Sequence, residues 1–147
     1  MTKNELVEFV KRELSTKVAA LKNDINSLVK DSSENSKPTS GDKHEVGLEM
    51  AMGELDRLTH QLDTYKRQYS ELELMDFSAK YVIEAGALVK TNRGVFLIST
   101  AFGLVKTGSL SPFCLSPQSP LAKALMGKAE GDQVEINGVR HTIVEVK

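Results

Sequence analysis

Two carboxylates three residues apart are the side chains of this chain whose type and spacing best suit chemistry. Asp31 and Glu34 stand in the segment Asp31-Ser32-Ser33-Glu34-Asn35, where a long helical pattern ends. On a last helical turn such a pair shares one face, although carboxylates there interact unfavourably with the helix dipole. Mg²⁺ takes oxygen ligands of this kind, with the remainder from water and a partner's phosphates. Two carboxylates are too few for a closed site, so we expect Asp31 and Glu34 to act together with another molecule.

The segment after this pair is rich in residues that form turns. Residues 32–42 include Pro38 and Gly41, which end a helix, together with Ser, Asn and Asp, which favour turns and caps. The simplest interpretation is a solvated loop between two helices. The position of the two carboxylates, at the point farthest from any core, favours a role toward a ligand. We call residues 31–42 the acidic tip.

Heptad-like patterns on both sides of the acidic tip predict an antiparallel helical hairpin. The first pattern starts at a capping box formed by Thr2 and Glu5 and continues in helical steps to Leu28. The second runs from Leu48 to Leu72 in unbroken steps of three and four, as in a coiled coil. Because the connection is short, the two helices should pack against each other in one chain. Homodimerisation through the same seams is the competing interpretation.

After residue 76 the apolar period changes from seven to two, which predicts a sheet domain over residues 77–147. Strands are expected over residues 86–91, 95–99, 113–115, 133–136 and 139–146. Asn137-Gly138 favours a type I′ turn between the last two strands, and Ser119 and Pro120 are suited to begin a short helix. The predicted fold class is α+β: an antiparallel coiled-coil hairpin over residues 1–76, followed by a small antiparallel sheet domain with one short helix.

Composition excludes several classes of protein. The 147 residues carry a net charge of −1, which argues against binding nucleic acid through bulk charge. Residues 1–76 hold 11 Lys and Arg against 15 Asp and Glu, whereas residues 77–147 hold 8 against 5. The single cysteine, Cys114, cannot form an internal disulfide, and we interpret it as a small buried residue rather than a nucleophile. Without an apolar stretch of signal-peptide or transmembrane type, the expected location is cytoplasmic.

Two motifs resemble the GreA/GreB family of bacterial transcription elongation factors. Residues 119–127 (Ser-Pro-Leu-Ala-Lys-Ala-Leu-Met-Gly), followed by Gly-Asp-Gln-Val at 131–134, are similar to that family's Ser-Pro-(Ile/Leu)-(Ala/Gly)-x-Ala-Leu-(Ile/Leu)-Gly and Gly-Asp-x-Val pattern. Residues 31–35 match the Asp-x-x-Glu-Asn of the family's coiled-coil tip. The resemblance covers nearly the whole chain in the same order, and it implies that the sheet domain is FKBP-like.

The resemblance also implies a partner and a role. The sheet domain would dock a monomeric chain at the rim of the RNA polymerase secondary channel, and the candidate contacts are Ser119, Pro120, Leu121 and Lys123. The hairpin would bring Asp31 and Glu34, with Asn35 beside them, to the polymerase's Mg²⁺ and the 3′ end of backtracked nascent RNA. Hydrolysis through two metal ions requires stabilisation of the attacking water and the leaving oxygen, to which incoming carboxylates can contribute. The chain would be a cofactor in trans, not an enzyme, and would bind no Mg²⁺ tightly by itself.

Two other classes of function remain open. Residues 36–41 interrupt the pattern of the family, whose members continue with helix-forming residues after the acidic pair. A non-cleaving regulator that binds the secondary channel, like the family's Rnk-like or anti-Gre relatives, would share the docking domain without needing such a pair. A prolyl isomerase or chaperone module would need an aromatic-lined pocket, and aromatic residues make up only 5% of the chain.

Overall fold

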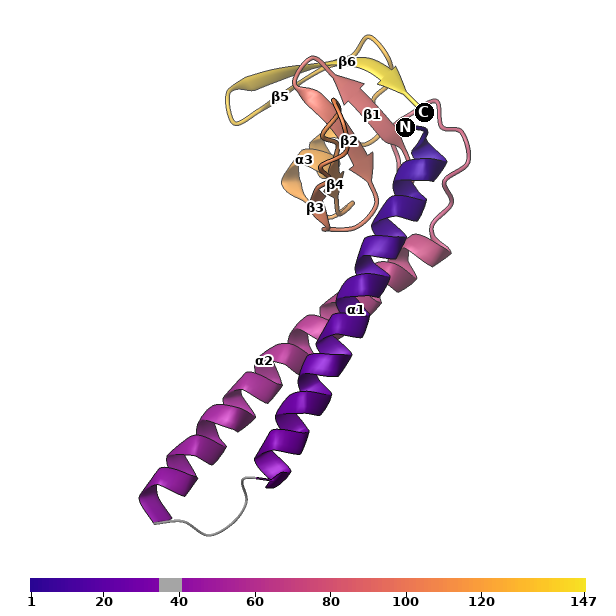
Figure 1. The fold of residues 1–147 in the computed structure, drawn as a ribbon. Coiled ribbons are helices and arrows are strands. Elements are labelled where there is room, and N and C mark those ends of the chain that lie inside the picture. The colour runs from indigo at the N-terminus through magenta and orange to yellow at the C-terminus, as the bar shows by residue number, and fades with distance from the viewer. Residues whose placement is uncertain (35–40) are drawn as a thin grey trace. The chain divides into compact units, whose positions relative to one another are not determined.

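The computed structural model describes residues 1–34 and 41–147, and the side chains of residues 1–31 and 46–147 (Figure 1). Two long helices come first, followed by a mixed sheet with one short helix, which confirms the predicted fold class. The elements are α1 (Lys3–Glu34), α2 (Gly41–Leu74), β1 (Leu88–Thr91), β2 (Gly94–Ile98), β3 (Gly103–Leu104), β4 (Phe113–Leu115), α3 (Pro120–Leu125), β5 (Gln133–Ile136) and β6 (Val139–Val146).

The chain forms two compact units, which are described separately. The hairpin unit comprises Arg12–Tyr69, and the sheet unit comprises Met1–Lys11 together with Ser70–Lys147. The first residues of α1 and the last residues of α2 therefore cluster with the strands rather than with the rest of the two helices. The sheet unit is thus built from both ends of the chain.

In the hairpin unit, α1 and α2 lie side by side and antiparallel (Figure 1). Leu21 of α1 forms a buried cluster with Leu58 and Leu62 of α2. Partly buried side chains extend this cluster along both helices: Val18, Ile25, Leu28 and Tyr65. These seam residues are covered by the helix of the same chain, as the hairpin interpretation predicts. Lys17 adds a cation–π contact, with its Nζ 5.5 Å from the centroid of the Tyr65 ring.

The start of α1 is fixed within the sheet unit by its cap and by a lysine. The predicted capping box is confirmed: the Glu5 N–H donates to Thr2 Oγ1 at 3.1 Å, and the Thr2 N–H donates to Glu5 Oε2 at 3.2 Å. Lys3 Nζ donates to the carbonyl oxygens of Ser78 and Gly86, at 2.9 and 3.1 Å. Burial lowers the pKa of Lys3. The amine therefore ties the first turn of α1 to the chain that leads into β1.

The sheet has the strand order β3-β4-β2-β1-β6-β5. Neighbouring strands are antiparallel except β2 and β4, which pair in parallel with Leu97 opposite Cys114. The two-residue strand β3, which the sequence analysis did not predict, lies antiparallel to β4. Because β3 reverses the chain direction after β2, β4 runs in the same direction as β2. The predicted Asn-Gly turn is confirmed, because Asn137 and Gly138 both have positive φ, 53° and 78°.

One face of the sheet is covered by α3. Alternate strand residues point toward the helix, as the period of two predicts, and they enclose Ala122 and Leu125 of α3, both fully buried. The remaining buried members of this core are Ile83, Ala87, Val89, Ile98, Leu115, Val134 and Ile143. Burial of a side chain such as Leu125 contributes about 2 kcal/mol, so this core holds α3 and its cap in place.

A buried lysine joins two carboxylates in the segment between α2 and β1. Lys80 Nζ lies 3.2 Å from Asp76 Oδ2 and 3.1 Å from Glu84 Oε1. Asp76 also accepts the Ser78 N–H at 2.9 Å. The hydrogen bonds from Ser78, and then that from Lys80, lower the pKa of Asp76 to about 2. The negatively charged form of Asp76 is therefore favoured in the folded protein.

The contribution of Asp76 to stability should depend on pH. Its pKa is lower in the folded chain than the usual value near 4, so its contribution is present above about pH 4 and is lost as the pH falls toward 2. We expect the difference in free energy of unfolding between the wild type and Asp76→Asn to shrink over this range, measured by urea denaturation. Glu135→Gln, on an exposed position of β5, serves as the control. A difference that stays constant from pH 6 to 2 would contradict the prediction.

Candidate functional site

The backbone places Asp31 and Glu34 in the last turn of α1, as predicted. The helix ends at Glu34, so the two residues lie three apart on one face of that turn. The Asp31 side chain is exposed. The Glu34 side chain and Asn35 fall outside the described part of the chain.

The end of α1 carries only negative side-chain charge in its last turn, as does the end of α2, where Glu71 and Glu73 stand. The last turn of α1 contains no basic residue, so two carboxylates stand at the negative end of the helix dipole without a cation beside them in that turn. Among the described residues, no hydrogen bond or ion pair joins Asp31 to another side chain. Such a pair costs stability locally, and a bound cation would remove that cost.

The donor set suits a hard metal ion but cannot hold one unaided. Carboxylate oxygens are the ligands that Mg²⁺ prefers, and it usually takes one or two of them with water and substrate phosphates. In the part of the chain that the structure describes, no group of three or more His, Cys, Asp or Glu is placed to bind a metal. Asp31 and Glu34 by themselves supply fewer oxygens than the six ligands of Mg²⁺.

The four predicted docking residues divide into two structural roles and two exposed positions. Ser119 caps α3, since its hydroxyl accepts the Ala122 N–H at 3.2 Å. Leu121 is half-buried and packs against the core under the sheet. Pro120 and Lys123, in contrast, are exposed on α3. A partner could therefore contact Pro120 and Lys123 directly, whereas Ser119 and Leu121 mainly hold the helix that presents them.

The cysteine and the sheet histidine are structural. Cys114 is a buried free thiol on β4, and burial raises its pKa to about 11, so the thiolate needed for nucleophilic chemistry is disfavoured. This confirms its interpretation as a small buried residue. His141 is buried on β6, with its ring 6.2 Å from the Phe96 ring in an edge-to-face arrangement.

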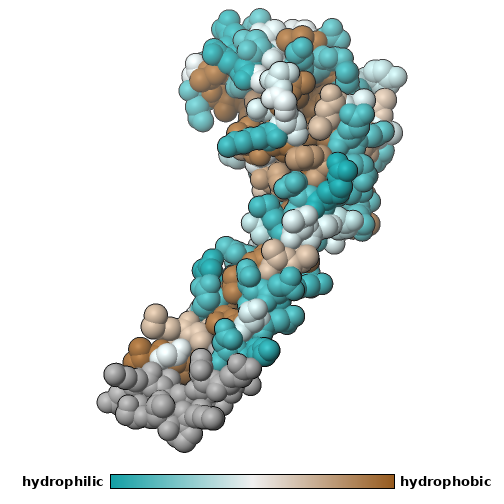
Figure 2. Space-filling model, in the orientation of Figure 1, coloured by the Kyte–Doolittle hydropathy of each residue, from teal (hydrophilic) through white to brown (hydrophobic). Residues whose placement is uncertain are grey.

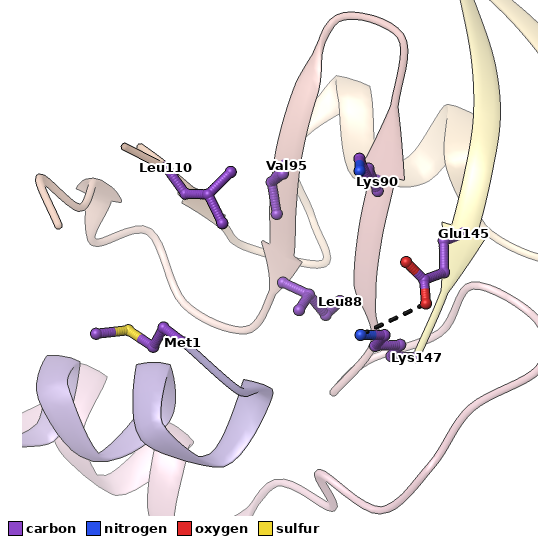
Figure 3. Close-up of a pocket in the computed structure, with 7 residues that line it drawn as sticks. All are labelled: Met1, Leu88, Lys90, Val95, Leu110, Glu145 and Lys147. Carbon is purple, nitrogen blue, oxygen red and sulfur yellow. Dashed lines mark ion pairs between the residues drawn. The ribbon is translucent and has the colours of Figure 1, made fainter. Parts of the chain in front are cut away.

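Two hollows in the sheet unit lack the features of an isomerase pocket. The first, of about 160 Å³, contains no aromatic side chain, and Lys147 Nζ lies 3.4 Å from Glu145 Oε1 beside it (Figure 3). Its lining residues are Met1, Leu88, Lys90, Val95, Leu110, Glu145 and Lys147. The second, of about 470 Å³, has Phe77 and Tyr81 on its wall, but Tyr81 is 86% exposed. Neither encloses a ligand between aromatic rings.

Sequence reasoning missed two lysines of the sheet unit, Lys3 on α1 and Lys80 in the segment between α2 and β1. The partners of Lys80 could have been found from the sequence, because Asp76 and Glu84 stand four residues before and after it. The partners of Lys3 could not be found in this way, since they are backbone oxygens 75 and 83 residues away. The Lys3 contacts fix the first turn of α1, and the Lys80 contacts stabilise the segment between α2 and β1.

Comparison with known proteins gives a match at the C-terminus. Residues 106–147 match the family model described as "Transcription elongation factor, GreA/GreB, C-term". No curated protein sequence matches the chain. Among the helices in the described residues, none is both long and apolar enough to cross a membrane.

Three solved structures of Gfh1 proteins are similar to the chain at low identity. A transcription factor Gfh1 shares 21% identity, with a TM-score of 0.39 and 92% coverage of both chains. The GreA factor homolog 1 (Gfh1) of Thermus thermophilus shares 20%, with a TM-score of 0.35 and coverage of 96% of this chain and 94% of that one. Gfh1 of Thermus aquaticus shares 18%, with a TM-score of 0.32 and coverage of 95% and 92%. At these values the three structures carry no argument about function.

Proposed function

We propose that this chain is an accessory factor of bacterial RNA polymerase, on the premise that its residues 106–147 belong to the GreA/GreB family as a C-terminal domain. In this proposal the sheet domain docks at the rim of the polymerase secondary channel. The hairpin then carries the acidic tip toward the polymerase active site. The chain acts as a monomer and needs no catalytic centre of its own.

The observation that carries the cleavage role is the acidic end of α1. Asp31 and Glu34 share the last turn of a helix that has no basic residue there, and Asp31 is exposed. Carboxylates at this end of a helix are unfavourable with the helix dipole. In the last turn of α2, Glu71 accepts the Thr100 hydroxyl at 2.6 Å, whereas Asp31 has no such partner among the described residues. The arrangement is therefore better explained by a cation that arrives with the partner.

The chemistry assigned to the two residues is ligation and orientation. Mg²⁺ shared with the polymerase would lower the pKa of a bound water and stabilise charge on the phosphate. Carboxylate oxygens of Asp31 and Glu34 would contribute to its ligand set, and either oxygen pair could accept a hydrogen bond from the attacking water. The result is hydrolysis of the backtracked RNA near its 3′ end by the polymerase.

The test of this proposal is RNA release from a stalled, backtracked polymerase complex in Mg²⁺, with and without the chain. Faster release of short 3′ fragments supports it. Binding to the polymerase without faster release would favour the non-cleaving regulator. Absence of binding would contradict both, and with them the assignment of the polymerase as the partner.

Docking should depend on the exposed face of α3. Reversing the charge at the exposed Lys123, by Lys123→Glu, is expected to weaken binding to core RNA polymerase by about tenfold, within the range of interface charge effects. The fold should be unchanged, because the Lys123 side chain is exposed. Fluorescence anisotropy of the labelled chain measures this.

The control for docking is Lys90→Glu, at an exposed lysine on β1. Equal weakening in both variants would show that net charge, not position, is responsible. Unchanged affinity of Lys123→Glu would place docking elsewhere on the chain.

A further inference from the structure

The first part of α2 exposes large apolar side chains on more than one face. The exposed fractions are 57% for Val46, 46% for Leu48, 72% for Met50 and 58% for Met52. At 100° per residue these four side chains point in several directions around the helix, so α1 can cover only some of them. A helix that is apolar on most of its circumference is normally buried. We call residues 46–56 the apolar segment.

The apolar segment borders a groove between the two helices. This groove, of about 170 Å³, is lined only by apolar residues: Leu28, Val29, Leu48, Ala51, Met52 and Leu55. Further along the same seam, Leu58 and Leu62 are buried, so among the described residues the seam is less well covered beside this groove than beyond it. Figure 2 shows apolar residues gathered on this end of the hairpin.

Local sequence gives this part of α2 little helical stability of its own. Gly47 and Gly53 lie inside the helix, and each costs about 1 kcal/mol relative to alanine. Neither glycine is required by a close neighbour, because a Cβ would meet nothing within 4 Å at either position. Since helices depend mainly on tertiary burial, a partner that covers the exposed side chains would stabilise the segment.

The charges around the groove indicate which partner fits. The apolar segment contains Glu49, Glu54 and Asp56 but no Lys or Arg. The next residue, Arg57, already donates from its Nε to Glu54 Oε2 at 2.9 Å. Glu49 and Asp56 lie three before and four after Met52, so they flank the groove on one stripe. On α1, Lys30 directly follows the groove residue Val29, and Lys22 lies seven residues before it. The carboxylates beside the groove therefore lie on the α2 side.

We propose that the apolar segment binds a cationic amphipathic helix of a partner protein. Its apolar face would fill the groove, and its Lys and Arg residues would lie beside Glu49 and Asp56. A second copy of the chain fits less well, because a two-fold contact through this segment would set its carboxylates against their own copies. The proposal rests on the hairpin unit alone and does not require that the partner be RNA polymerase.

The test uses the full chain and a labelled 18-residue helical peptide of Leu and Lys, with a matched peptide of Leu and Glu. We expect the Leu/Lys peptide to bind the wild type with a Kd on the order of 10 μM, and the Leu/Glu peptide to bind at least tenfold more weakly. Leu48→Gln with Met52→Gln, at two exposed residues that line the groove, should weaken Leu/Lys binding at least tenfold. Leu74→Gln, at an exposed apolar residue of the same helix, is the matched control and should change the Kd less than twofold.

A charge variant tests the proposal independently if the Leu48 and Met52 substitutions alter the helix. Glu49→Lys with Asp56→Lys should reverse the preference, so that the Leu/Glu peptide binds more tightly than the Leu/Lys peptide. Equal binding of both peptides to the wild type, or no effect of either double variant, would overturn the proposal. A concentration-dependent dimer in sedimentation equilibrium that Leu48→Gln with Met52→Gln abolishes would replace the proposed partner with a second copy.

Discussion

Replacing Asp31 by Asn and Glu34 by Gln together is expected to reduce stimulated RNA cleavage by about 100- to 1000-fold, the effect of removing a group that stabilises transition-state charge. The amides keep the size and polarity of the side chains but remove the negative charge that ligates a cation. Binding to the polymerase should be unchanged, because neither substitution touches the sheet unit. The measurement is the rate of 3′ fragment release at saturating concentrations of the chain.

Asp24→Asn is the matched control for this prediction. Asp24 is an exposed carboxylate on the same helix, seven residues before Asp31. Its replacement should leave the cleavage rate within about twofold of the wild type. A double variant of Asp31 and Glu34 that cleaves as fast as the wild type would remove the acidic tip from the mechanism.

Replacing Gly86 by alanine is expected to destabilise the sheet unit by more than about 4 kcal/mol, a loss that single substitutions rarely cause. Gly86 has a φ of +91°, and a Cβ at this position would lie 1.9 Å from the Asp76 carbonyl oxygen. The backbone cannot easily shift, because the Gly86 N–H donates to Ile98 O at 2.7 Å and its carbonyl accepts Lys3 Nζ. Urea denaturation followed by circular dichroism measures the loss.

Gly131→Ala separates the clash from the backbone conformation. Gly131 has the same φ of +91°, but a Cβ there would meet nothing within 4 Å. The free energy of unfolding of this variant should fall only by the cost of a non-glycine residue in the left-handed conformation, about 1–2 kcal/mol. If both variants lose the same free energy of unfolding, the clash of a Cβ with the Asp76 carbonyl oxygen adds nothing to the cost of the left-handed backbone at residue 86.

Features set by local sequence could be predicted. The capping box at Thr2 and Glu5, the heptad seam, the Ser119 cap and the Asn137-Gly138 turn each depend on residues a few positions apart, and each is confirmed. The backbone positions of Asp31 and Glu34 in a last helical turn follow from the same kind of pattern.

Features set by distant contacts could not be predicted. Strand β3 has two residues, too few to show a period, and the parallel pairing of β2 with β4 depends on where the intervening chain turns. The exposure of each residue in the motif at 119–123 also required the structure, because a motif does not tell which of its residues a partner can reach. For the docking surface, the sequence identified the helix, and the structure separated the exposed Pro120 and Lys123 from the other two.

The assembly of the sheet unit from both ends of the chain has a consequence for the order of folding. Lys3 reaches oxygens 75 and 83 residues away, and Leu88 exchanges backbone hydrogen bonds with Lys147 at 2.9 Å. Contacts between distant residues form slowly, whereas helical contacts form early. During synthesis, α1 and α2 can pair as soon as both have left the ribosome, while the first turn of α1 must wait for the strands before it gains its final neighbours.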